Sequence, residues 1–158
     1  KELQEVVQRR VSKKAGSGFI RSLLGRKCRF DLWEPNLFLS SKALQKEEAL
    51  IEYGDNIKRA YTYRALNRLI QASAADQTKA SMVEVHKQTG KVPLVQIHDE
   101  LAFSVEDQAE AENLCGIMEK GAPLQVPTPC DISLGPSWGD LKKVDFKDMS
   151  RIIPEEDL

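Results

Sequence analysis

Apolar and polar residues alternate with different periods along this chain, and these periods indicate where helices and strands form. Residues 1–14 have the pattern of the end of a helix, which glycines stop shortly afterwards. Residues 19–24 and 27–33 favour the two strands of a hairpin that turns at Gly25. The amino-terminal part is therefore predicted to combine a helix with an antiparallel ribbon.

A polar loop over residues 35–41 is predicted to lead into a second helix. Ser40 or Ser41 is expected to cap that helix, because a hydroxyl oxygen can accept a hydrogen bond from the first-turn N–H groups. The helix is expected to continue to about Tyr53 and to end at Gly54.

The longest helix is expected over residues 57–89, where Gly90 closes it. Its packing stripe recurs at spacings of three and four and consists of Leu66, Leu69, Ile70, Ser73, Met82 and Val85. Asn67 and Gln71 lie one turn apart on a face that also carries Arg64, so their amides project in one direction. Such amides can reach the minor-groove acceptors of any base pair. Solvent-facing amides on an ordinary helix are the alternative interpretation.

The segment VQIHDELAFSV places His98, Asp99 and Glu100 between two short apolar runs, which favours a hairpin with a polar tip. A turn with an odd number of residues, centred on Asp99, sets Ile97 opposite Leu101 and makes one face uniformly apolar. We therefore expect that register rather than a two-residue turn. Asp99 and Glu100 are hard oxygen ligands of the kind that hold Mg²⁺ against a phosphate, whereas a plain surface turn needs no such role.

The remainder of the chain alternates between helical and extended patterns. Residues 106–120 favour a helix whose apolar side consists of Ala109, Ala111, Leu114, Ile117 and Met118. Residues 124–134 indicate a strand, which Pro127 and Pro129 restrict to an edge position or a bulge. Trp138 is expected to be a plain core residue, and packing beside the polar hairpin tip is the alternative. An acidic tail with no recognisable chemistry follows from residue 145.

Charge is segregated along the chain although the formal net charge is only −1. The basic residues from Gln8 to Arg29 have no acid among them, and a second acid-free cluster runs from Lys58 to Arg68. Acids gather instead between Asp99 and Glu119. This distribution suits a domain that meets a phosphate backbone on one side, although solvated helix ends produce the same pattern.

Composition indicates an ordinary globular domain with one core, because 41% of the 158 residues are apolar. The cysteines Cys28, Cys115 and Cys130 are widely spaced and odd in number, so buried reduced thiols are expected. No apolar run approaches the roughly 20 residues that a membrane span needs. We therefore expect no membrane association and a reducing, aqueous compartment.

Four segments together resemble the palm of family A DNA polymerases, the polymerase I type. They are YTYRALNRLIQASAAD at 61–76, QIHDEL at 96–101, LGPSWGD at 134–140 and LGRKCR at 24–29. The first resembles the family's long helix with a basic residue, Asn and Gln, and the second resembles motif C. Arg64 precedes Asn67 by three positions, a spacing closer to the replicative polymerases of podophages than to the bacterial enzymes.

The resemblance implies an α+β fold, with an antiparallel palm-type sheet and the HDE hairpin packed on long helices. It divides the chain into the end of a fingers-region helix (1–17), the carboxyl-terminal palm subdomain (18–142) and a tail (143–158). No motif A strand and no fingers helix is found in the sequence, which begins at Lys1. We therefore expect a partial polymerase domain that does not polymerise alone.

The resemblance also implies template-directed DNA synthesis with two Mg²⁺ ions, a primer-template DNA and a dNTP. It further implies a cytoplasmic location in a bacterium or a phage-infected cell. Asp99 is expected to be a catalytic metal ligand and Glu100 to assist it, while the second carboxylate comes from an upstream palm and fingers portion. The expected primer-template contacts are His98, Asn67, Gln71, Arg64, Arg26 and Lys27. A subunit of a split polymerase and a non-catalytic palm-like domain that binds nucleic acid remain alternatives.

Overall fold

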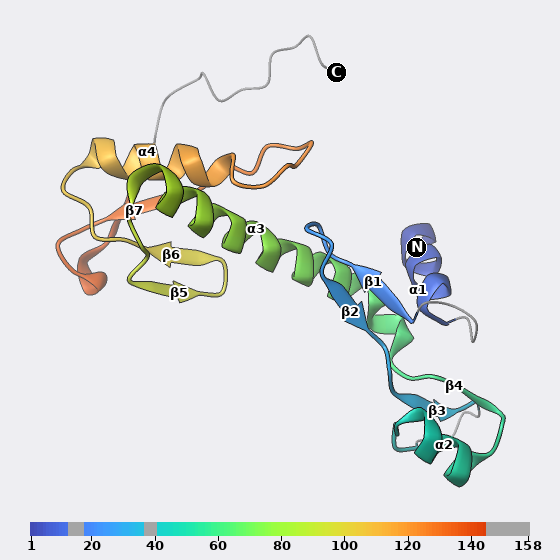
Figure 1. Cartoon of the computed structure of the whole chain (residues 1–158). Helices are drawn as coiled ribbons and strands as arrows, with labels where there is room; N and C mark the ends of the chain where they lie inside the picture. The colour runs from blue at the N-terminus through green and yellow to red at the C-terminus, as the bar shows by residue number, and fades with distance from the viewer. Residues whose placement is uncertain (13–17, 37–40, 145–158) are drawn as a thin grey trace. The chain divides into compact units, whose positions relative to one another are not determined.

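The computed structural model describes residues 1–12, 18–36 and 41–144 (Figure 1). The chain divides into two compact units, Lys1–Asp76 and the residues from Gln77 onward. Helices alternate with short strands, and each of the four sheets in the described ranges is a two-stranded antiparallel ribbon. This arrangement confirms the predicted α+β class.

The first unit begins with helix α1 (Glu2–Ser12) and the hairpin of β1 (Phe19–Arg21) and β2 (Lys27–Arg29). Residue Phe19 pairs with Arg29, as the predicted turn around Gly25 requires. Helix and hairpin share a core made of Val7, Val11, Ile20, Phe30 and Ala65, against which Leu66 and Leu69 pack. The predicted helix and hairpin are therefore confirmed, with shorter strands than expected.

A second ribbon in this unit joins β3 (Trp33–Pro35) to β4 (Ile57–Arg59), with helix α2 (Lys46–Tyr53) between them in sequence. Its core consists of Trp33, Ala49 and Ile57, with Leu44 and Tyr53 packed against them. The prediction that a serine caps this helix is wrong for Ser41, because Gln45 occupies the N-cap position of α2 and its side chain makes no capping hydrogen bond. Ser40 lies outside the described residues.

Helix α3 (Ala65–Thr89) follows a single 3-10 turn, η1 (Thr62–Arg64), and spans the boundary between the two units. The prediction of a helix from residue 57 was wrong because Ile57 is buried in the β3–β4 ribbon and Tyr61 has a left-handed φ of 59°. Gly90 ends the helix as predicted, with a φ of 74° that glycine adopts without steric cost.

The second unit contains the β5–β6 hairpin (Val95–Ile97 and Glu100–Ala102), helix α4 (Gln108–Glu119) and the β7–β8 ribbon (Ile132–Leu134 and Lys142–Val144). Its core is formed by Val85, Leu114 and Ile117, with Phe103, Val105 and Met118 packed against them. The lack of a side chain at Gly121 allows the turn after α4 to lie close to Ser81 of α3, because a Cβ atom at this position would lie 2.7 Å from the Cα atom of Ser81.

Three expectations about this unit were wrong. Ala109 is exposed, and the strand predicted over residues 124–134 is confined to β7, because the prolines leave the preceding backbone without ladder pairing. Trp138 is not a core residue, since 57% of it is exposed in the 3-10 turn η2 (Trp138–Asp140). Strand β8 ends at Val144, and residues 145–158 lie outside the described part of the chain.

Candidate functional site

The β5–β6 hairpin places the HDE motif at a tight turn. Ile97 pairs with Glu100, so His98 and Asp99 form a two-residue connection. His98 has a left-handed φ of 53°, and its carbonyl oxygen accepts a hydrogen bond from Nε2 of Gln96 at 3.1 Å. The predicted odd-numbered turn is therefore wrong. It assumed that burial selects a uniformly apolar face, whereas Val95 and Ile97 are 38% and 44% exposed.

Both carboxylates of the motif are available at this tip. Asp99 and Glu100 are exposed, and neither side chain has an ion pair or a hydrogen bond within the described ranges. Carboxylate oxygens suit Mg²⁺, which needs near-octahedral oxygen coordination and keeps several waters. No third His, Cys, Asp or Glu in the described residues gathers with these two. The hairpin tip therefore fits one side of a magnesium site.

The base of the hairpin is clamped by Lys91. Its ammonium group donates a hydrogen bond to the Ser104 carbonyl oxygen at 2.8 Å and forms an ion pair with Glu110 of α4 at 2.7 Å. Two hydrogen bonds hold the pKa of the Glu110 carboxyl below its usual value. The bond from Lys91 has the larger effect and the bond from the Glu106 N–H the smaller one. Because residues 91 and 104 flank the two strands, this clamp fixes the hairpin to the start of α4.

The helix face predicted to follow a primer-template is only partly formed as expected. Asn67 and Gln71 are exposed and lie one turn apart on α3. Arg64 is not on that helix but in the preceding turn η1, where its Nε donates a hydrogen bond to the Tyr63 hydroxyl at 3.0 Å. The guanidinium also lies 5.3 Å from the ring centroids of Tyr61 and Tyr63. These tyrosines therefore hold Arg64.

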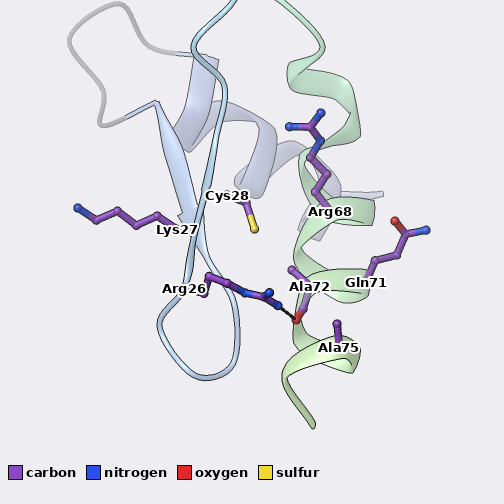
Figure 2. Close-up of a pocket in the computed structure, with 7 residues that line it drawn as sticks. All are labelled: Arg26, Lys27, Cys28, Arg68, Gln71, Ala72 and Ala75. Carbon is purple, nitrogen blue, oxygen red and sulfur yellow. Dashed lines mark hydrogen bonds between the residues drawn. The ribbon is translucent and has the colours of Figure 1, made fainter. Parts of the chain in front are cut away.

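A pocket of about 480 Å³ lies between the β1–β2 hairpin and the first half of α3 (Figure 2). It is lined by Arg26, Lys27, Cys28, Arg68, Gln71, Ala72 and Ala75. Three predicted contact residues, Arg26, Lys27 and Gln71, thus share one pocket, whereas Asn67 and Arg64 are not among its lining residues. The pocket combines three basic side chains with one amide, a set that suits a phosphate-bearing ligand.

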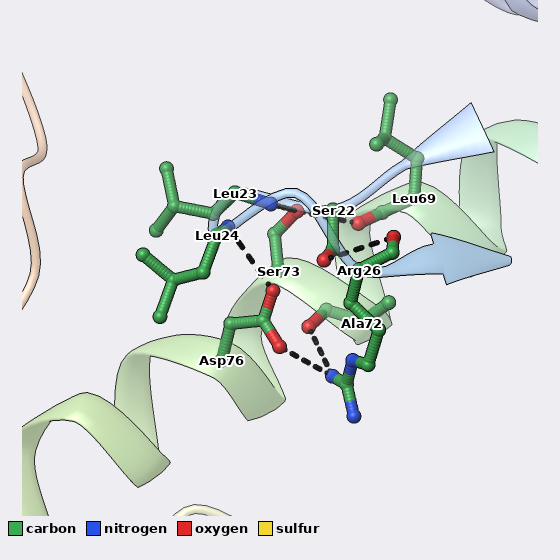
Figure 3. Close-up of polar contacts among 8 residues, drawn as sticks. All are labelled: Ser22, Leu23, Leu24, Arg26, Leu69, Ala72, Ser73 and Asp76. Carbon is green, nitrogen blue, oxygen red and sulfur yellow. Dashed lines mark hydrogen bonds and ion pairs between the residues drawn. The ribbon is translucent and has the colours of Figure 1, made fainter.

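Polar contacts attach the hairpin turn to α3 (Figure 3). The N–H of Leu23 donates to the Ser73 hydroxyl at 3.1 Å, and the N–H of Leu24 donates to the Asp76 carboxylate at 3.2 Å. Arg26 forms an ion pair with Asp76 and donates to the Ala72 carbonyl oxygen at 3.0 Å. Asp76 is buried, so one carboxylate both positions the turn and orients a pocket guanidinium.

Arg68 and Asp76 were not predicted from the sequence as site residues. Arg68 donates to the Arg29 carbonyl oxygen at 3.2 Å and lies 5.0 Å from the ring centroid of Phe30. Its position at the end of the acid-free cluster from Lys58 was the available signal. Asp76 gave no comparable signal, because only the packing of the hairpin on α3 identifies its partners.

The part of the chain that the structure describes contains no helix that is both long and apolar enough to cross a membrane. Cys115 is buried, whereas Cys28 and Cys130 are half-buried, so the expectation of buried thiols is confirmed for one of the three cysteines.

Comparison with known proteins identifies similar sequences. The model of the family described as DNA polymerase family A matches residues 1–140. A DNA-directed DNA polymerase of Pseudomonas phage M6 is 37% identical over 122 residues, which are 77% of this chain and 15% of that protein. DNA polymerase I of Bacillus subtilis (strain 168) is 38% identical over 95 residues, 55% of this chain and 11% of the relative. The chain thus spans a small fraction of the length of these relatives.

Proposed function

This chain belongs to DNA polymerase family A, and we propose that it supplies the motif C part of a palm that carries out template-directed DNA synthesis. The observation that carries the proposal is the β5–β6 hairpin, whose tip presents two exposed carboxylates without a partner in the described residues. The phage relative is named a DNA-directed DNA polymerase, and the bacterial relatives are named DNA polymerase I.

In this proposal Asp99 is a metal ligand and Glu100 supplies a further oxygen close to it. Mg²⁺, when bound, lowers the pKa of an attacking hydroxyl and neutralises charge on a triphosphate. Asp99 then holds the cation at the hairpin tip, and His98 contacts the phosphate or sugar of the primer terminus. The clamp of Lys91 on Ser104 and Glu110 keeps the tip in place, because it fixes both ends of the hairpin.

The first unit is proposed to hold the primer-template. Asn67 and Gln71 donate hydrogen bonds to minor-groove acceptors that occur at every base pair, which makes the contact independent of sequence. Lys27 and Arg68 bind backbone phosphates from the pocket, and Arg64 contributes a further cation beside α3. Arg26 has a mixed role, since its ion pair with Asp76 already positions the hairpin turn.

A second carboxylate is required from outside these 158 residues. Two metal ions need ligands on both sides, and Asp99 and Glu100 provide one side only. The exposure of apolar residues along the first strand of the hairpin and just before it supports a covering segment, because Val92 and Leu94 are 65% and 73% exposed and precede the half-exposed Val95 and Ile97. The upstream palm and fingers portion, on the same polypeptide or on a partner subunit, is the proposed source.

Primer extension tests the proposal. The purified chain is expected to give no extension of a labelled primer-template with Mg²⁺ and dNTPs, and extension is expected when the upstream palm and fingers portion is added in trans. Extension by the chain alone would refute the need for a second carboxylate. A reconstituted mixture that binds primer-template but never extends it would favour the non-catalytic palm-like domain instead.

A further inference from the structure

The end of helix α4 gathers two sulfur atoms and a carboxylate. Cys115 and Glu119 lie one turn apart on α4, and Cys130 approaches them from the segment that leads into β7. The Sγ atoms of both cysteines and a Glu119 carboxylate oxygen all lie within 4.8 Å of one another. Across the described ranges, no other three His, Cys, Asp or Glu side chains are gathered this closely.

Hydrogen bonds already hold these groups in place. Oε1 of Glu119 accepts a hydrogen bond from the Cys130 N–H at 2.9 Å and one from the Cys115 thiol at 3.7 Å. The Cys115 thiol also lies 3.8 Å from the Cys130 carbonyl oxygen, and the Thr128 hydroxyl donates to the Glu119 carbonyl oxygen at 3.5 Å. The segment after α4 is thus hydrogen-bonded to both the carboxylate and the backbone carbonyl of Glu119, and Cys115 is only 3% exposed.

We propose that Cys115, Glu119 and Cys130 bind a thiophilic divalent cation such as Zn²⁺, with water as the fourth ligand. Thiolates select zinc over magnesium or calcium, which prefer oxygen ligands alone. Tetrahedral bonds of about 2.3 Å to sulfur and 2.1 Å to oxygen separate a sulfur from an oxygen by roughly 3.6 Å. The Cys115 and Glu119 atoms already lie 3.7 Å apart.

The cation would require little rearrangement and would have a structural effect. Two sulfur ligands of one tetrahedral ion lie roughly 3.8 Å apart, and the two Sγ atoms lie within 4.8 Å. The bound ion would replace the thiol protons and fasten the segment between α4 and β7 to the end of the helix. This site uses no residue of the β5–β6 hairpin, so it is separate from the magnesium site proposed above.

Cobalt substitution tests the site directly. Co²⁺ added to the reduced 158-residue chain is expected to produce the absorption of tetrahedral cobalt with a thiolate-to-metal charge-transfer band, saturating at one ion per chain. Zn²⁺ is expected to displace the cobalt and to raise the thermal unfolding midpoint. Absence of the charge-transfer band at saturating Co²⁺ would overturn the proposal.

Two substitutions and one control locate the ligands. Cys130→Ser is expected to abolish the band in a protein whose circular dichroism is unchanged, and Glu119→Gln to weaken cobalt affinity at least about tenfold. Cys28→Ser is the control, because Cys28 lies in β2 of the other unit, and it should leave the titration unchanged. Equal loss in the Cys28 variant, or full binding by the Cys130 variant, would contradict the assignment. A Cys115–Cys130 disulfide formed with oxidised glutathione by a chain that binds no cobalt would also refute it.

Discussion

Asp76 provides the sharpest test of how the first unit holds its basic pocket. Its carboxylate accepts a hydrogen bond from the Leu24 N–H at 3.2 Å and pairs with Arg26, and its side chain is only 6% exposed. Asp76→Ala therefore removes a charged hydrogen bond and an ion pair together. The β1–β2 turn is then expected to lose its principal attachment to α3.

The expected loss of stability follows from these contacts. A hydrogen bond from a backbone N–H to a buried carboxylate contributes about 1.5 kcal/mol. The ion pair contributes about 1 kcal/mol, since the Arg26 side chain is 46% exposed and water screens the charge. Asp76→Ala is thus expected to lower the free energy of unfolding by about 2–3 kcal/mol. Ser73→Ala, which removes the neutral bond from the Leu23 N–H, should cost about 1 kcal/mol.

Urea unfolding followed by circular dichroism measures these differences. A double-mutant cycle of Asp76→Ala with Arg26→Ala should give a coupling energy of about 1 kcal/mol. Asp31→Ala is the matched control, because Asp31 is exposed in the same unit, and its effect should stay within about 0.5 kcal/mol. An Asp76→Ala effect as small as that of the control would refute the role of Asp76 as the attachment point.

Three further predictions concern α4, the hairpin clamp and the pocket. Gly121→Ala should destabilise the protein by about 1–3 kcal/mol in urea unfolding, because the new Cβ would lie 2.7 Å from the Ser81 backbone, whereas Gly116→Ala has open space and should not destabilise it. Because the pKa of Glu110 is lowered in the folded protein, its carboxylate stabilises the fold at pH values above the unfolded pKa of about 4.3, and this stabilisation is lost as the pH falls through the folded pKa. Glu110→Gln should therefore reduce the fall of the thermal unfolding midpoint with decreasing pH. An unchanged fall would contradict the clamp. Arg68→Ala should reduce the salt slope of primer-template binding by about one, whereas Gln71→Ala should weaken binding with an unchanged slope.

The sequence predicted elements whose signals are local. Gly25, Gly54 and Gly90 each mark the end or turn that the structure has, because a glycine acts on its own backbone. Strand β4 was mistaken for the start of a helix because its pairing with Trp33–Pro35 is a contact distant in sequence. The hairpin register failed for a related reason, since parity assumed a buried face that Val95 and Ile97 do not have here.

The candidate site residues that could be predicted were likewise those with local sequence signals, and those missed depend on contacts distant in sequence. Asp99, Glu100, Asn67 and Gln71 belong to short motifs, and each is exposed as its proposed role requires. The contributions of Asp76 and Arg68 depend on the β1–β2 hairpin lying against α3, which no pattern in the chain specifies. The cluster of Cys115, Glu119 and Cys130 was not predicted either, because only the folded chain brings Cys130 close to the two residues of α4.

The central claim is tested most directly by the rate of Mg²⁺-dependent primer extension by this chain combined with the proposed upstream palm and fingers portion. The rate is measured for Asp99→Asn beside Glu106→Gln. The two changes remove the same charge, and Glu106 is an exposed residue outside the hairpin. Asp99→Asn should lower the extension rate by at least about a hundredfold and leave primer-template affinity within about twofold, and Glu106→Gln should alter neither. Extension preserved in the Asp99 variant, or a parallel loss of DNA affinity, would contradict a metal-binding role for this carboxylate.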